Sequence, residues 1–308
     1  MRILLLLVSL LFSHFSFSEP SFWSAKKGNI DLMIIGSVHV GNAGMYPLPK
    51  PILNHLKESK GLIVEIDPTD IQGLSLPSPK IRSMQILNEQ QRKELINISE
   101  DLALPKQHLL NSPPWSSAIT IQQKQWQLFG YTSEFGVDNH FIQSALNNAV
   151  PLLPLETTQF QLGLFTTMKQ EGAALLLITL DEYKDGKLPF DCLINSWKRG
   201  DDDDLSALLT QSDMPEDIAN SLIYNRNKDW SDKLSDANFY SSVQGHIKKT
   251  KNTAQPDKYT MVVGALHLVG KDNVLQLLTE KGFTVLKRST KTIGQTSLTL
   301  QCETLISS

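Results

Sequence analysis

Apolar runs near the start of the chain predict two β-strands with a helix between them. Residues 30–35 and 62–66 are rich in aliphatic side chains. Lys27, Gly28 and Asn29 predict the turn of a hairpin that leads into the first run. Residues 51–60 predict a helix. A strand, a crossover helix and a strand in this order predict a parallel pair.

The end of the chain returns to the same alternation. Apolar periodicity there predicts strands at residues 259–263 and 283–286, a helix at residues 272–281 that ends at Gly282, and an edge strand at residues 297–302. Residues 150–155 predict one more strand. We therefore expect a mixed α/β fold in a single domain, residues 19–308, whose central sheet is built from N- and C-terminal segments.

The middle of the chain, about residues 85–250, predicts mostly helices that cover the sheet as a cap. The Pro- and Ser-rich residues 68–84 predict a loop before it. Residues 138–149 show a helical period, with one apolar face made of Phe141, Ile142, Ala145 and Leu146. A turn at residues 184–187 and the acidic run 201–204 interrupt the pattern, and the run is typical of a solvated loop or a helix start.

Residues 1–18 have the pattern of a secretory signal peptide, with Arg2, an apolar run and then small residues before a cut at Glu19. An uncleaved anchor is the alternative, but the run is shorter than the roughly 20 apolar residues of a membrane span. We expect a periplasmic or secreted protein whose mature chain does not span the membrane. Such a compartment permits a disulfide between Cys192 and Cys302, which the sequence alone does not bring together.

Composition narrows the classes of ligand. The chain has 308 residues, of which 41% are apolar, and this is enough for a sizeable core. Its net charge is −3, and it has no long basic stretch. Nucleic-acid binding is therefore not expected, since it usually requires a basic surface.

Two segments far apart in the chain share an apolar run followed by Gly-x-x-His. They are LMIIGSVHVG and TMVVGALHLVG, and their histidines are His39 and His267. Glu65 lies at the carboxyl end of the run LIVEI. Because ligands of open α/β sheets bind at the carboxyl ends of the strands, we expect the three side chains to meet there. Two imidazoles and a carboxylate suit a hydrolytic metal centre, although either histidine alone could be a core or capping residue.

Further polar residues are secondary candidates. Arg226 could bind a substrate carboxylate or an oxyanion, or form an ion pair on a helix surface. Tyr46 could bind substrate or anchor the loop before Pro47, and Glu156 ends a strand as Glu65 does. Asp138 fits a helix N-cap. Other polar or aromatic residues are expected to be structural: His140, His246, Trp197 and Trp230.

Several motifs in order carry a family resemblance: GSVHVG with MYPLP (36–49), VEID (64–67), GVDNHF (136–141), PLETTQFQL (154–162), SWKRGD (196–201), NRNKDW (225–230), VVGALHLVG (262–270) and KGFTVL (281–286). Over most of the chain the sequence resembles the TraB/GumN family, whose animal relatives include the Tiki membrane metalloproteases. The resemblance implies a mixed α/β fold and, for the Tiki branch, metal-dependent peptidase activity. It assigns His39, Glu65 and His267 to the corresponding motifs, while Leu266 stands where relatives often have glycine.

These observations lead to the hypothesis of an exported metal-dependent hydrolase, in the first place a peptidase, that acts on a peptide or a small molecule. His39 and His267 would hold a divalent cation (Mn, Co, Zn or Fe), with Glu65 as a third ligand or the general base. Arg226 would stabilise the tetrahedral intermediate. Tyr46 and Glu156 would bind substrate. Two alternatives stay open: a periplasmic protein that binds or inhibits a peptide without turnover, and metal-free hydrolysis by His and Glu.

Overall fold

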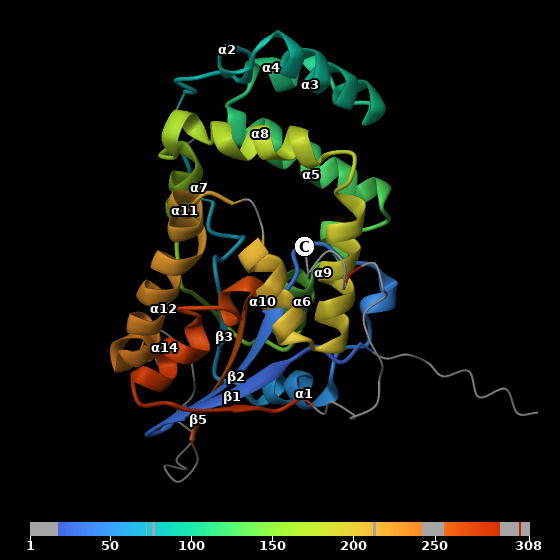
Figure 1. Cartoon of the computed structure of the whole chain (residues 1–308). Helices are drawn as coiled ribbons and strands as arrows, with labels where there is room; N and C mark the ends of the chain where they lie inside the picture. Colours follow the sequence, from blue (N-terminus) through green and yellow to red (C-terminus); the bar gives the residue numbers. More distant parts are fainter. Residues whose placement is uncertain are drawn as a thin grey trace, which may run out of the picture.

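The segments at the two ends of the chain form one mixed sheet in the computed structural model (Figure 1). The structure describes residues 18–71, 73–75, 78–211, 214–241, 256–289 and 302. The strands are β1 (Phe22–Lys27), β2 (Ile30–Ser37), β3 (Leu62–Val64), β4 (Leu152–Pro154), β5 (Asp257–Gly264) and β6 (Thr284–Lys287). Their order is β4-β3-β5-β2-β1-β6, so the predicted mixed α/β fold is confirmed. Most of the expected signal peptide, the strand expected at 297–302 apart from Cys302, and His246 lie outside the described residues.

The predicted hairpin is present, but another strand lies between the two strands that were predicted to form a parallel pair. β1 and β2 are antiparallel, and Gly28 in their turn has a φ of 55°, which glycine adopts without a steric penalty. β5 lies between β2 and β3 and is parallel to both. The direct pairing of β2 with β3 is therefore wrong. The long strand β5 is buried along most of its length, as a central strand must be, and so separates them.

Helices cover both faces of the sheet. On β2, Leu32 and Ile34 face one core cluster and Ile35 faces the other, as the alternation of a strand requires. The first cluster also contains side chains of α12 (Asn225–Ser235) and α14 (Val274–Glu280). The second contains side chains of α1 (Lys50–Glu58), α6 (Val137–Asn147) and α9 (Lys187–Arg199). Each such side chain contributes about 1.5–3 kcal/mol by leaving water.

The helix predicted at residues 138–149 is α6, and its buried side chains include Phe141, Ile142 and Ala145. Leu146 was predicted on the same face, but it is 49% exposed. The buried positions 137, 141, 142 and 145 form one stripe along the helix. Leu146 lies one residue beyond that stripe, and its direction takes it into solvent.

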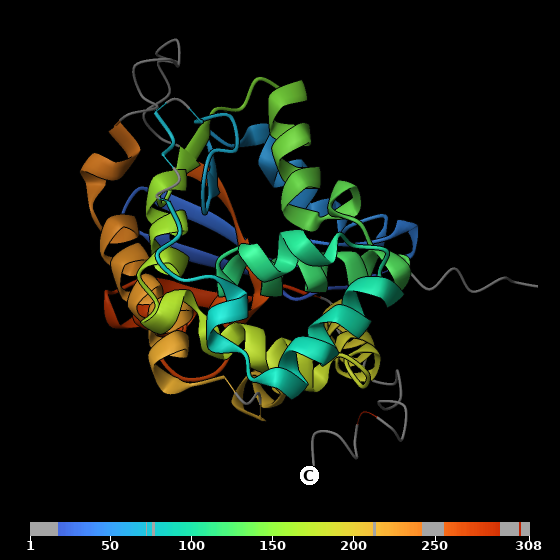
Figure 2. The same cartoon turned by 90° about the horizontal axis from the view of Figure 1, so that it is seen from above.

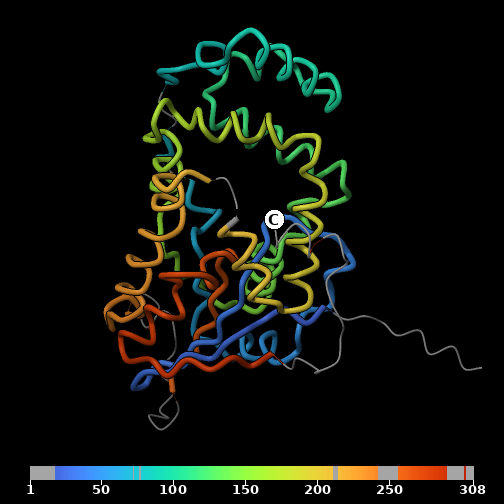
Figure 3. The backbone as a smooth tube through the Cα atoms, viewed as in Figure 1, coloured from blue at the N-terminus to red at the C-terminus, as the bar shows by residue number. Residues whose placement is uncertain are grey.

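The predicted helical middle region is confirmed, and part of it has a core of its own. The helices α2 (Ser83–Ile86), α3 (Glu89–Asp101), α4 (Lys106–Asn111), α5 (Pro114–Leu128) and α8 (Ala173–Glu182) supply this core. Figure 1 shows them above the sheet, and Figure 2 shows them from above. In Figure 3 the backbone reaches them through α7 (Thr158–Thr166) on one side and through α9 on the other. Side chains of α5 and of the sheet edge line one cavity, which is described below.

The shorter elements complete the chain. They are the 3-10 turns η1 (Ala43–Met45), η2 (Ser133–Phe135), η3 (Lys169–Glu171), η5 (Ala237–Tyr240) and η6 (Ala265–Leu268), the π-helical turn η4 (Asn220–Tyr224), and the helices α10 (Asp202–Gln211) and α11 (Glu216–Ala219). The acidic run therefore begins a helix. Cys192 on α9 forms a disulfide with Cys302, with Cα atoms 5.8 Å apart. In the described part of the chain, no helix is long and apolar enough to cross a bilayer.

Candidate functional site

The two Gly-x-x-His motifs leave the sheet at the same edge. β2 and β5 are neighbours in parallel register, with Ser37 opposite Gly264. A Cβ atom at Gly36 would lie 2.8 Å from Cα of Ala265, so the close approach of the second motif requires glycine there. The two histidines are therefore brought to the same edge of the sheet although more than 200 residues separate them.

The side chain of His39 lines the cavity described below and forms an ion pair with Asp138. Its side chain is 66% exposed, and Nδ1 lies 3.4 Å from Oδ1 of Asp138. The Asp138 carboxylate outweighs partial burial and raises the pKa of His39 to about 9. Asp138 was predicted as an N-cap, but Gly136 occupies that position. Asp138 instead lies in the first turn of α6, where its carboxylate faces the imidazole.

Backbone contacts hold the His39 loop against the start of α6. The N–H of Val137 donates to the carbonyl of Val38 over 3.0 Å, and Gly41 and Thr132 exchange two hydrogen bonds. A Cβ atom at Gly136 would lie 2.5 Å from the carbonyl oxygen of His39. The glycine of GVDNHF thus permits the contact that places Asp138 beside the imidazole.

Glu65 lies just beyond β3 and is held by three donors. Its Oε1 accepts the N–H of Gly264 at 2.7 Å, and its Oε2 accepts from Arg226 at 2.6 Å and from Gln161 at 3.1 Å. Burial raises the pKa of Glu65, but the charges of His267, Arg226 and His39 and the Gly264 hydrogen bond together lower it to about 2. Glu65 is therefore an anion throughout the neutral range.

Arg226 on α12 is the centre of the site. It was predicted to clamp an oxyanion or to pair on a helix surface, and the second alternative is wrong because the residue is buried. Its Nε and Nη2 bind Glu156 at 2.9 Å, and Nη2 also binds Glu65. Nη1 donates to the carbonyl of Leu222 at 2.9 Å and contacts Nε2 of His267 at 3.3 Å. All five N–H groups are engaged, so a substrate oxyanion can use one only if a bond is released.

His267 is buried, and its neutral tautomer is determined by its neighbour. Nδ1 lies 2.7 Å from Oδ1 of Asn227, so Nδ1 carries the hydrogen and Nε2 is the acceptor. The ring contacts the indole of Trp230 at 4.3 Å between centroids. Burial lowers the pKa of His267 to about 4. The charges of Arg226 and His39 also lower it, and the charge of Glu65 raises it. The imidazole is therefore neutral at pH 7.

The two predicted substrate-binding residues are already engaged with protein groups. Glu156 is buried and accepts from Arg226 and from Nε1 of Trp230 at 2.8 Å. The hydroxyl of Tyr46 donates to the carbonyl of Phe135 at 2.8 Å, and its ring lies 4.8 Å from that of His140. Glu156 is therefore a charge partner of Arg226, and Tyr46 anchors a loop. A role of either residue in substrate binding stays a prediction.

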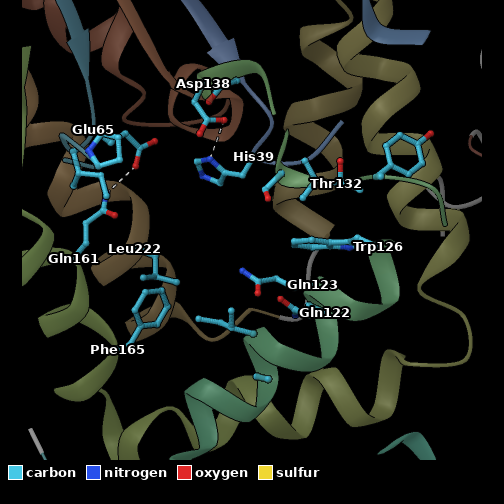
Figure 4. A pocket seen from close by; sticks show the side chains of 18 of the residues that line it. His39, Glu65, Gln122, Gln123, Trp126, Thr132, Asp138, Gln161, Phe165 and Leu222 are labelled. Carbon is cyan, nitrogen blue, oxygen red and sulfur yellow. Dashed lines mark hydrogen bonds and ion pairs between the residues drawn. The ribbon is translucent and has the colours of Figure 1, made fainter. Parts of the chain in front are cut away.

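The exposed face of the site opens into a cavity of about 760 Å³. Figure 4 shows His39, Asp138 and Glu65 on one side of it, and Gln122, Gln123 and Trp126 of α5 on the other. Phe165 and Leu222 lie along a third side. The volume falls within the roughly 300–1,000 Å³ that is typical of ligand pockets. Polar groups converge at one end of a largely apolar space.

Residues 21–287, which hold all of these groups, match the family model described as the TraB/PrgY/gumN family. The chain belongs to this family. It is similar to the uncharacterized protein YbaP of Escherichia coli (strain K12) and of Shigella flexneri. Each is 28% identical over 266 residues, which cover 85% of this chain and 93% of the relative. No solved structure matches.

This TraB-family site contains donors of the types that divalent metals take, two imidazoles and a carboxylate. Asn227 faces Nδ1 of His267 at 2.7 Å and Asp138 pairs with Nδ1 of His39 at 3.4 Å, which is the arrangement of partners around metal-ligating histidines. Because the pKa of His39 is about 9, its Nε2 could bind a metal only with loss of a proton. Arg226 opposes metal binding, because its Nη1 contacts Nε2 of His267 and this contact must break before Nε2 can bind a metal. It is the longest contact of the guanidinium. Within the described residues, no three side chains of His, Cys, Asp or Glu are already gathered as ligands.

Three groups that orient the site were not predicted from the sequence: Asn227, Trp230 and Gln161. Asn227 and Trp230 follow Arg226 by one and four residues on α12, and Trp230 was expected only to pack. Gln161 bridges the two carboxylates, with 3.1 Å to each. The available signal was a helix that places an arginine and a tryptophan on one face at a spacing of four residues. This spacing shows that Arg226 and Trp230 lie on one face of α12, but it does not show that both bind Glu156.

Proposed function

We propose that this protein is a metal-dependent hydrolase, in the first place a peptidase. One observation carries the proposal: His39 and His267 lie with Glu65 at the carboxyl edge of the sheet, where His39 and Glu65 line the cavity and a neighbouring side chain faces Nδ1 of each histidine. Nε2 of His39, after loss of its proton, Nε2 of His267 and the Glu65 carboxylate would hold the metal. The metal would lower the pKa of water toward neutrality and polarise the scissile carbonyl.

The surrounding residues support distinct roles. A general base works best with a pKa near the working pH. The pKa of Glu65, about 2, therefore favours the role of an anionic ligand over that of the base. Asp138 and Asn227 would orient the two imidazoles. Arg226 would keep Glu65 ionised and could release its contact to His267 when a cation binds.

A second candidate is metal-free hydrolysis, and the position of Arg226 favours it. The guanidinium already supplies a cation between Glu65, Glu156 and His267. With a pKa of about 9, His39 is protonated at pH 7 and could donate a proton to the leaving amine in the cavity. In this reading the site needs no other cation.

Divalent-metal calorimetry on residues 19–308 tests the two candidates, with His39→Ala, His267→Ala and the exposed control His108→Ala. Saturable binding near one equivalent, lost in both site variants and kept in the control, would support the metal centre. A peptide library with and without chelator then follows. Turnover that resists the chelator would favour metal-free hydrolysis. Ligand binding without turnover that survives His39→Ala would favour a peptide-binding or inhibitory protein.

Export to the periplasm or the medium is part of the proposal. The N-terminal pattern supports it, and so does the Cys192–Cys302 disulfide, because disulfides persist in oxidising compartments. Cell fractionation of the full-length chain, with mass spectrometry of its N-terminus, tests it. An uncleaved chain in the cytoplasm would refute it.

A further inference from the structure

The charges that line the cavity are confined to one end. Among the described lining residues, the carboxylates and imidazoles are those of His39, Glu65 and Asp138, and no lysine or arginine is present. Each of the three already has a partner, because His39 pairs with Asp138 and Glu65 pairs with Arg226. The rest of the wall is neutral, and most of it is apolar. A charged ligand group there would lose water without gaining a counter-charge.

The wall opposite the site offers groups that match a peptide backbone. Gln123 and Gln127 are exposed on α5, and in the described part of the chain no hydrogen bond to either amide is found. A glutamine amide has both donors and an acceptor, as a peptide group has. Beside them Trp126 presents an apolar ring that is backed by Phe190, stacked at 5.5 Å between centroids. Amides and apolar surface therefore alternate along this wall.

We propose that the cavity takes an internal, uncharged stretch of a peptide chain, so that cleavage is endo-acting. The cleavage step rests on the proposed hydrolase function. In it one water is added across the amide: the C–N bond breaks, the hydroxyl joins the acyl carbon and the proton goes to the leaving amine. A terminal ammonium or carboxylate in the neutral part would be desolvated and unpaired. At the site end, His39, Asp138 and Glu65 already have charge partners, so a chain terminus is disfavoured there as well. About 760 Å³ suits a short segment and excludes a folded domain.

Matched fluorescent peptides of one apolar and glutamine-rich sequence test the inference. One is acetylated and amidated, one has free termini, and two blocked peptides carry a central lysine or aspartate. Anisotropy measures binding to the full chain, and mass spectrometry locates any cleavage. The variant Gln123→Glu places an anion in the neutral wall, and Gln107→Glu, exposed on α4 and outside the cavity lining, is the matched control.

The blocked neutral peptide should bind about tenfold more tightly than the central-lysine and central-aspartate peptides. Gln123→Glu should shift the preference toward the lysine peptide by a similar factor, while Gln107→Glu leaves it unchanged. Preferred binding or cleavage at free termini would overturn the inference and leave the hydrolase proposal standing. Tight binding with this selectivity, but without cleavage in the presence of any divalent metal, would refute the hydrolase proposal and support an uncharged peptide as the ligand. Weak binding of all peptides, or displacement by a neutral oligosaccharide, would overturn the inference.

Discussion

Replacing Arg226 with glutamine removes the positive partner of two buried carboxylates. The side chains of Glu65 and Glu156 are 13% and 4% exposed. Loss of one member of such a buried network costs about 3–5 kcal/mol, because the remaining charge is left unpaired. The pKa of Glu65 gives a scale for all of its partners together, because His267, Arg226, His39 and the N–H of Gly264 all lower it. It is about 2 instead of 4.5, and at about 1.4 kcal/mol per tenfold change its ionised form contributes about 3 kcal/mol to stability.

The pH dependence follows from the same carboxylate. Because its folded pKa is depressed, its contribution is present above pH 4.5 and is lost as the pH falls toward 2. Without the guanidinium, Glu65 takes up a proton more easily in the folded state. The deficit of Arg226→Gln should therefore be largest near pH 7 and smaller near pH 4.

Urea unfolding followed by circular dichroism at both pH values measures this deficit as a free energy of unfolding. Lys93→Gln is the control, since it removes a cation whose pair with Glu89 is exposed on both sides. That change should cost under about 1 kcal/mol at either pH. If Arg226→Gln costs no more than the control near pH 7, or if its deficit grows in acid, the electrostatic reasoning is wrong.

Three further perturbations test the surroundings of the site. Asp138→Asn should lower the pKa of His39 from about 9 to 6.5 or below, because the carboxylate is the main group that raises it; an NMR titration that finds the pKa unchanged contradicts the pairing. Asn227→Ala should weaken metal binding about 10- to 100-fold by freeing the ring of His267; equal affinities in calorimetry would remove that orienting role. Reduction of the disulfide, which joins positions 110 residues apart, should lower the free energy of unfolding by about 4–5 kcal/mol; urea midpoints that coincide with and without dithiothreitol would refute this.

Local patterns predicted the elements well, and the pairing of strands less well. The run from Ile30 and the turn at Gly28 contain their own hairpin signal, because neighbours in the chain make the contacts. The position of β5 between β2 and β3 depends on a pairing across about 200 residues, which no local period encodes. Leu146 shows the same limit at the level of one side chain. Helical spacing placed it near the apolar stripe, and only the packing of α6 decided that it faces solvent.

The candidate site divides in the same way. His39, Glu65 and His267 could be named because strand ends with glycine are visible in the sequence, and the parallel edge brings them together. The identity of their partners could not be read. Arg226 reaches the site from a helix on one face of the sheet, and Asp138 reaches it from a helix on the other. Such contacts are fixed by tertiary packing. In the sequence each appears only as one polar residue within a helical segment, which does not identify its partner.

The insertion of β5 links completion of the fold to completion of the site. β5 supplies the parallel neighbour of both β2 and β3, the N–H of Gly264 that binds Glu65, and the histidine that follows at position 267. Without this strand, Glu65 would lack one of its three donors, and β2 and β3 would have no shared neighbour. The contacts of the candidate site are therefore complete only when β5 is part of the sheet. Two Gly-x-x-His motifs at opposite ends of one chain make sense for this reason, since the sheet edge that they share forms only when the last long strand is in place.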